Sequence, residues 1–476
     1  MRIGRQTDSS RIFVTAWLVY AAFWNPWLQS SMTFNFLDAA VSFVDTGRWE
    51  MAHPQFYQWF DTATLPGRVV SAEPPGVAVV LLPLYWAWRS LFGLVDTVET
   101  FQQFNGAAAL LVGATASAFV AVQAAWLAGW LGAGRCGRLW TAALVAFGTQ
   151  GFYFGTTLYK ENLAACAVIT SFRLAVEPGG SWRRVVAGAA GGLAVTIVHP
   201  TGFFLALLAL LVGVREKVGR AAAFCVGCAP FIGVLAIYNQ WLFGKPWLTG
   251  YYFITDLATP GFVPPKIPIL VDLLIGPSGG LFLYAPFLLC AVAGVIRLLR
   301  TERQGEAIVA GVFLVGLWLL AASWQSQFSD NAICSQGLGP RMLFPGVPLL
   351  AAFAGPYLEH VGRNVRLVVV VPSIFFGYLS AQAGLIPGVE LLSYAVKTWI
   401  SGAGMGILFK EALPLWFGLD TLHTIVGRPD VTAGDVLRLL PTAQGMQLMG
   451  NQALFLALNL AVLGILFLLL KRIWQR

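Results

Sequence analysis

The sequence predicts an all-α polytopic membrane protein with about 12 transmembrane helices and further helices lying against the outer membrane face. Of its 476 residues, 57% are hydrophobic and only 11% are charged, whereas a soluble domain carries about 25% charged residues. Apolar runs recur along the whole chain, and a membrane helix needs about 20 such residues. Lys and Arg gather in alternate loops, as they do on the cytoplasmic side of membrane proteins.

The apolar runs that predict helices follow one another along the chain. Basic residues precede the first run, which places the N-terminus inside. No signal-peptide cleavage site is evident before that run. The runs are 12–31, 76–94, 104–131, 139–158, 162–177, 185–198, 202–214, 219–243, 280–297, 307–323, 342–358, 366–386 and 452–470.

The run at 76–94 decides the topology. If it does not cross the membrane, 19 of the 30 Lys and Arg residues fall on the inner side, and if it crosses, only 12 do. The bias of Lys and Arg toward short cytoplasmic loops favours the first arrangement. We therefore expect a juxtamembrane helix at 76–94 that starts at Pro74 and Pro75, and both termini in the cytoplasm. The long outer segments are then 32–103, 244–279, 324–341 and 387–451.

Composition and motifs argue against several function classes. Basic cytoplasmic loops explain the formal net charge of +8, so this charge does not indicate nucleic-acid binding. Cys225 and Cys228 form a C-x-x-C inside an apolar run, where cysteine packs as a small hydrophobe. The scattered histidines predict no metal site, and no glycine-rich nucleotide-binding loop is found. Charged residues are almost absent from the spans, which argues against a proton-coupled transporter or an ion channel.

The outer segments carry acids that could perform chemistry. Asp38 follows the first span, in a stretch (35–46) that can form an amphipathic helix ended by Gly47. A half-shielded carboxylate of this kind suits a general base, and a solvated or capping aspartate is the alternative. Glu73 precedes two prolines that stiffen its backbone, which suits a positioned ligand or base. The alternative for Glu73 is an acid that complements a helix N-terminus.

Other outer residues are candidates for substrate binding. Arg341, in SQGLGPRMLFP, is placed to hold a lipid phosphate, or else it anchors its span at the interface. Lys160 and Glu161 follow a tyrosine at a helix junction, where they either face a substrate or pair with each other. His199 precedes a proline between two runs, and a hydrogen-bonded core histidine is its alternative. The further candidates are Lys245 and Lys266 for phosphate, and His53 and Asp61 for substrate.

Several stretches together resemble the GT-C superfamily of membrane glycosyltransferases. NFLDAAVSFVDTGRW resembles its first-loop segment, and GRVVSAEPPGVAVVLLPLY resembles the segment that follows. FGTTLYKENLAA, FGKPWLTGYY with GPSGGLFLYAPFLL, and GLGPRMLFPGVPLLAA resemble later motifs. The order and spacing agree over residues 30–360. Five motifs in order are specific for the superfamily and not for a substrate.

The resemblance implies an enzyme that takes a sugar from a polyprenyl-phosphate carrier on the outer leaflet and passes it to an acceptor. The first-loop carboxylate is the base in such enzymes, and by position it corresponds to Asp38. Two positions depart from the pattern, because Phe36 stands in place of an arginine and Glu73 in place of a lysine. No cofactor is required, and a divalent metal is neither indicated nor excluded. Residues 1–386 then form the catalytic module, while 387–476 hold an outer amphipathic segment and the last span.

The sequence thus predicts an inverting glycosyltransferase of a bacterial inner membrane, with its active site on the outer face. Asp38 would deprotonate an acceptor hydroxyl of a lipid or glycan. Arg341, with Lys160, Lys245 or Lys266, would meet the charge of the leaving phosphate. A lipid-linked saccharide flippase is the alternative, and it would need polar groups along a path through the membrane. A scaffold is a third reading, and it would need no acids and bases gathered on one face. The sequence identifies neither the sugar nor the acceptor.

Overall fold

The computed structural model describes residues 3–24, 31–56, 62–216, 218–254, 261–276, 280–325, 340–383 and the single positions 464 and 468. The predicted outer segment 387–451 and the predicted site residue Asp61 lie outside the described residues. The same holds for nearly all of the last predicted span, 452–470. The division at residue 386 therefore stays a prediction.

The first half of the described chain is helical apart from one hairpin. Its elements are α1 (Ile3–Ala22), α2 (Ser31–Thr46), η1 (Pro54–Phe56), β1 (Thr62–Leu65), β2 (Arg68–Ser71), α3 (Gly76–Phe92), α4 (Val98–Ala108), the π-helical η2 (Ala109–Ala114), α5 (Thr115–Trp130), α6 (Arg135–Phe147), α7 (Gly151–Thr156), α8 (Lys160–Val176), α9 (Ser181–Ile197), α10 (Thr201–Arg215) and α11 (Val218–Phe243).

The second half adds further helices of varied length and one further strand pair. Its elements are η3 (Gly250–Phe253), β3 (Gly261–Phe262), α12 (Ile267–Ile275), α13 (Leu281–Tyr284), α14 (Leu288–Leu298), α15 (Gln304–Ser323), β4 (Trp324–Gln325), η4 (Arg341–Leu343), α16 (Val347–Ala352), α17 (Ala354–His360) and α18 (Arg363–Ala383). Helices dominate as predicted, but β1 pairs with β2 and β3 with β4, both antiparallel. The all-α prediction omitted these two small sheets.

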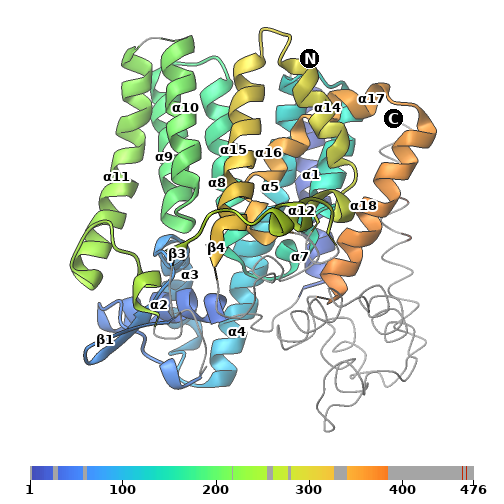
Figure 1. Ribbon diagram of the computed structural model, residues 1–476. Coiled ribbons are helices and arrows are strands. Elements are labelled where there is room, and N and C mark those ends of the chain that lie inside the picture. Colours follow the sequence, from blue (N-terminus) through green and yellow to red (C-terminus); the bar gives the residue numbers. More distant parts are fainter. Residues whose placement is uncertain are drawn as a thin grey trace.

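The long helices form a bundle, with α8 to α11 side by side (Figure 1). Within the described part of the chain, three continuous helical stretches are long and apolar enough to cross a membrane: Val98–Trp130, Val218–Phe243 and Gln304–Ser323. Gly76–Phe92, Thr201–Arg215 and Leu288–Leu298 are apolar but shorter. The chain is thus an integral membrane protein in character, and the count of twelve spans stays a prediction.

Small residues bring α9 and α11 into close contact. A Cβ added at Gly188 of α9 would overlap the backbone oxygen of Phe224, and one at Gly227 of α11 would overlap that of Val185. Membrane helices pack closely where glycine lets their backbones approach. The two helices therefore pack closely, with backbone against backbone at these glycines.

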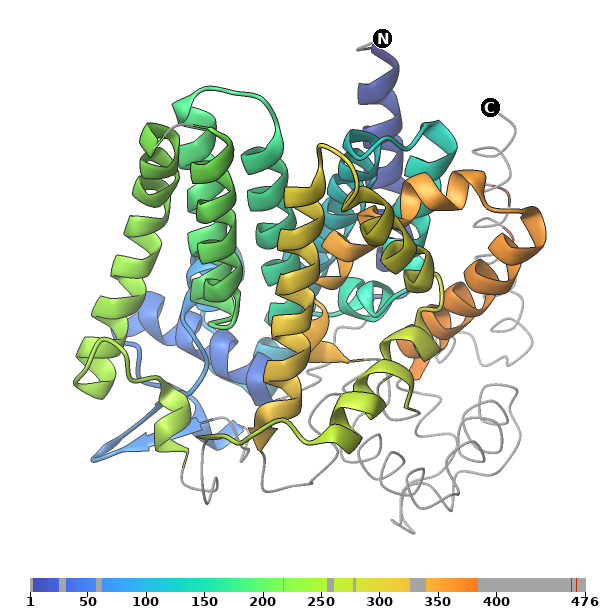
Figure 2. The same cartoon turned by 45° about the horizontal axis from the view of Figure 1, so that its top comes forward.

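A layer of short elements covers the end of the bundle away from the N-terminus. It contains α2, α3 and the β1–β2 hairpin, and the turned view in Figure 2 shows these blue elements at the same end. Helix α2 ends at Gly47, as predicted, where φ is 72° and the amide donates to the carbonyl of Phe43. Glycine adopts this left-handed conformation without a steric penalty.

Helix α3 packs against α2 along its length. The hydroxyl of Tyr85 donates to Asp45 Oδ2 at 2.8 Å, and Arg89 Nη1 lies 3.0 Å from Asp45 Oδ1. At the other end, a Cβ on Gly76 would overlap Thr196 at the end of α9. This arrangement is consistent with the predicted juxtamembrane position of 76–94, and its placement relative to a bilayer stays a prediction.

Candidate functional site

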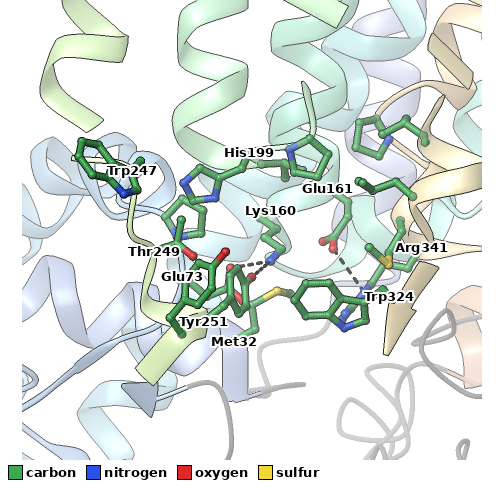
Figure 3. Close-up of a pocket in the computed structure, with 18 residues that line it drawn as sticks. Met32, Glu73, Lys160, Glu161, His199, Trp247, Thr249, Tyr251, Trp324 and Arg341 are labelled. Atoms are coloured by element: carbon green, nitrogen blue, oxygen red, sulfur yellow. Dashed lines mark hydrogen bonds and ion pairs between the residues drawn. The ribbon is translucent and has the colours of Figure 1, made fainter. Parts of the chain in front are cut away.

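A cavity of about 370 Å³ is lined by residues of α2 and of the segment before α3 together with residues of the helix bundle. Five predicted site residues line it together: Glu73, Lys160, Glu161, His199 and Arg341. Figure 3 shows these side chains converging from separate segments of the chain. Among the predicted residues that the structure describes, these five form one group.

Each of the five residues stands at a helix terminus or in a turn. Glu73 lies just before the two prolines that precede α3, and Lys160 and Glu161 open α8. His199 lies in the turn between α9 and α10, and Arg341 opens η4. Polar side chains at helix ends avoid the cost of lying deep within an apolar span. The cavity therefore collects charge where several helices begin or end.

Lys160 is held by two partners from different segments. Its Nζ lies 2.5 Å from Glu73 Oε2 and donates to the hydroxyl of Tyr251 at 3.1 Å. The same Nζ lies 5.8 Å from the centre of the Tyr251 ring. Glu73 is buried, so its charge is compensated by a directly bonded ammonium, as buried charges require.

Glu161 faces Arg341, with Oε1 at 3.3 Å from Nε. The alternative in which Lys160 and Glu161 pair with each other is therefore not what the structure has, since each pairs with a residue distant in sequence. Glu161 is only 3% exposed. Its second oxygen, Oε2, is buried and has no hydrogen-bond partner within the described ranges.

His199 is the neutral member of the group. Burial lowers the pKa of its imidazole to about 4, and the nearby ammonium of Lys160 adds to this effect. Its Nε2 is buried without a hydrogen-bond partner among the described residues, which does not favour the alternative of a hydrogen-bonded core histidine. The ring is therefore uncharged at neutral pH.

Sequence reasoning missed the aromatic lining of the cavity. Trp247, Tyr251, Tyr252 and Trp324 line it beside the charged groups. Three of these lie in FGKPWLTGYY, the motif in which the sequence analysis named Lys245 as a candidate but none of the aromatic residues. Its aromatic density was the available signal, but membrane interfaces are also rich in Trp and Tyr.

Asp38 and His53 form a separate pair outside the residues that line the cavity. Asp38 Oδ1 lies 2.8 Å from His53 Nδ1, and Oδ2 accepts the backbone N–H of His53 at 3.0 Å. Asp38 is fully buried, and the imidazole stacks on Phe56 with ring centres 4.7 Å apart. The two residues, predicted for different roles, are thus one unit in which histidine occupies both carboxylate oxygens.

The remaining predicted cations lie elsewhere. Lys245 is exposed in the turn after α11, and Lys266 precedes α12. Neither is among the residues that line the cavity. In the described ranges no group of three or more His, Cys, Asp or Glu side chains is arranged to hold a metal ion.

Comparisons with known proteins show a likeness to solved structures but not to known sequences. No family model matches the sequence, and no curated protein matches it. Among solved structures, ArnT from Cupriavidus metallidurans in the apo state shares 14% identity, with a TM-score of 0.49, covering 97% of this chain and 77% of the other. ArnT from the same organism bound to undecaprenyl phosphate shares 14% identity, with a TM-score of 0.44, covering 98% and 77%. Likeness at this level does not by itself assign an activity to the chain.

Proposed function

We propose that the chain is a membrane glycosyltransferase of the GT-C type that transfers a sugar from a polyprenyl-phosphate carrier to an acceptor hydroxyl. One observation carries this proposal: four stretches that resemble GT-C motifs, far apart in sequence, contribute residues to one cavity. They supply Glu73, Lys160 with Glu161, Tyr251, and Arg341. If these stretches resembled GT-C motifs only by chance, there would be no reason to expect their residues to line the same cavity.

The two cations of the cavity suit the phosphate of the carrier lipid. Arg341 offers a planar fork that matches phosphate oxygens, and Lys160 offers a compact ammonium. Each already contacts a carboxylate, so a bound phosphate would share these cations with Glu73 and Glu161. As the phosphate leaves, the developing charge would be stabilised by groups that are already in place.

The reaction in this proposal is a single displacement that inverts the anomeric centre. The acceptor hydroxyl gives up its proton to the base while its oxygen attacks the anomeric carbon. The bond from that carbon to the phosphate oxygen breaks, and its electron pair leaves with polyprenyl phosphate. Asp38 is the proposed base, acting as one unit with His53, whose ring contacts Oδ1. The acceptor would then approach from the side of α2.

The proposed setting is the outer face of a bacterial inner membrane, with both termini in the cytoplasm. The donor is a polyprenyl-phosphate sugar within reach of the bilayer, and the acceptor is a lipid or a glycan. The scheme uses only side chains of this chain.

Purified protein incubated with a panel of polyprenyl-phosphate sugars tests the proposal. Release of free carrier in the presence of acceptor is the expected result, and the absence of release from every donor would contradict it. Asp38→Asn separates an enzyme from a flippase. The enzyme keeps its affinity for carrier but loses turnover, whereas a flippase keeps its transport rate.

A further inference from the structure

Two buried side-chain atoms of residues that line the cavity have no hydrogen-bond partner in the part of the chain that the structure describes. They are Oε2 of Glu161 and Nε2 of His199, and both residues line the same space. Leaving a buried polar atom unsatisfied is unfavourable, and more so for a charged group. Native proteins keep few such atoms, and a ligand that completes the bonding is one physical reason to keep them.

The chemistry of Glu161 restricts what that ligand can be. Its Oε1 faces the guanidinium of Arg341. Burial raises the pKa of this carboxyl group, and the cations of Arg341 and Lys160 act against that effect by favouring its ionised form. An ionised carboxylate only accepts hydrogen bonds. A group that binds Oε2 must therefore donate, as a sugar hydroxyl does, and a second carboxylate placed there would be repelled.

His199 adds a second, uncharged position. A neutral imidazole presents Nε2 either as a donor or as an acceptor, according to its tautomer. A hydroxyl group can satisfy both cases, because it donates and accepts. In Figure 3, His199 and Glu161 reach into the cavity on either side of Lys160. The aromatic rings of Tyr251 and Trp324 line the same cavity and can pack against the C–H face of a sugar ring.

We propose that Glu161 and His199 form the sugar subsite of the cavity, and that this subsite accepts a neutral hydroxylated sugar and rejects a sugar that carries a carboxylate. The inference rests on the proposed function and names the substrate class for the same site. Arg341 and Lys160 then bind the phosphate, while Glu161 Oε2 accepts a hydrogen bond from the sugar. Glu161 is in this respect a specificity-determining residue.

The test compares two donors that differ only in this charge, polyprenyl-phosphate glucose and polyprenyl-phosphate glucuronic acid. If the panel identifies another neutral sugar, that sugar and its uronic acid replace them. Wild type should prefer the neutral donor at least about 100-fold in kcat/KM. Glu161→Gln should lower kcat/KM for the neutral donor about 10-fold to 100-fold, as expected for a lost hydrogen bond to a charged group. It should also reduce the preference at least about tenfold, because the repulsive charge is gone.

Glu99→Gln is the matched control, because Glu99 is an exposed acid in the first turn of α4. It should change neither kcat/KM nor the preference. Binding of polyprenyl phosphate without sugar checks the fold of each variant and should be retained. If Glu161→Gln does not fold, His199→Phe gives the same readout from the other atom, as a drop in kcat/KM for the neutral donor with carrier binding intact.

The outcomes separate this inference from the proposed function. If wild type releases carrier from the neutral donor but Glu161→Gln leaves the preference unchanged, the inference is overturned and the glycosyltransferase stands. If wild type uses the acidic donor as well as the neutral one, the inference also fails. If no donor releases carrier, both fail together. With His199→Phe, activity within threefold of wild type overturns the subsite.

Discussion

The ammonium of Lys160 lies 2.5 Å from Glu73 Oε2, although 87 residues separate them in the sequence. The pair joins the first turn of α8 to the start of α3. In the motif that this stretch resembles, a lysine stands at the position of Glu73. Here the glutamate takes that position and a lysine from another helix lies against it. The cation beside Glu73 is thus supplied by α8.

Removing Lys160 alone should destabilise the protein more than removing both partners. Lys160→Ala leaves the buried carboxylate of Glu73 without its cation, and breaking a buried ion pair in this way costs about 3–5 kcal/mol. In Glu73→Gln with Lys160→Met, no charge is left uncompensated, so part of that loss should be recovered. Thermal unfolding in detergent measures the difference. A double variant that is no more stable than Lys160→Ala would show that the pair contributes little.

Asp38→Asn should leave carrier binding intact and lower turnover by about 100-fold or more, since a positioned base contributes about 10²–10⁴ to a rate. Asparagine keeps an oxygen that can accept the His53 backbone N–H at the present Oδ2 position, so the local fold should survive. His53→Gln should lower turnover too if the two residues act as one unit. Single-turnover kinetics with a saturating donor provides the measurement, and full turnover by Asp38→Asn would remove Asp38 from the mechanism.

The stability of the protein should fall as pH drops from about 6.5 toward 4, in part because of His199. Burial lowers its folded-state pKa from 6.5 to about 4, so between these values the unfolded chain binds a proton that the folded chain does not. Stability then rises with pH across this window. His199→Gln removes this contribution and should flatten the profile. Unfolding midpoints recorded every half pH unit for both proteins test the prediction, and superimposable profiles would argue against it.

The sequence predicted many of the helical runs to within a few residues, because apolar periods and helix-ending glycines act locally. Gly47 is an example, since its position marks the end of α2 and its φ of 72° explains why. The bounds of the run 12–31 were wrong, since α1 spans Ile3–Ala22. The positions of charged residues relative to the apolar runs also predicted which of them lie at helix ends. Pairing was harder to predict, because it depends on how helices rotate and on how loops fold back. Asp38 and His53 were named for different roles, and their contact exists only because the chain reverses after Gly47 and returns over α2.

The residues that line the cavity also show that tertiary contacts were harder to predict than helices. Lys160 and Arg341 were predicted to act together, and they do line one space. Lys245 and Lys266 are also cations, and both lie in the predicted outer segment 244–279. They do not line the cavity. Residue type and predicted topology indicate on which side of the membrane a charged residue lies. Whether its side chain lines a given cavity depends on tertiary packing, which a local sequence pattern does not predict.

Gly227→Ala should destabilise the α9–α11 pair, although alanine favours helices. The added Cβ would overlap the backbone oxygen of Val185, and overpacking of this kind costs about 1–3 kcal/mol. Gly233→Ala is the matched control, because Gly233 lies on the same helix with nothing near an added Cβ. It should be neutral or stabilise by up to about 1 kcal/mol. Equal unfolding temperatures for the two variants would indicate that the helices separate easily.

Arg341→Lys should weaken binding of polyprenyl phosphate about tenfold while keeping the charge of the cavity. Lysine is a point charge and cannot reproduce the fork that meets both a phosphate and Glu161 Oε1. Arg341→Ala should weaken binding further, because Glu161 then remains buried beside the ligand without its cation. Titration of carrier lipid at two salt concentrations measures both effects. Lys245→Ala provides the comparison, since that exposed lysine lies outside the cavity lining and its loss should leave affinity unchanged. Equal losses from Lys245→Ala and Arg341→Ala would place the phosphate elsewhere.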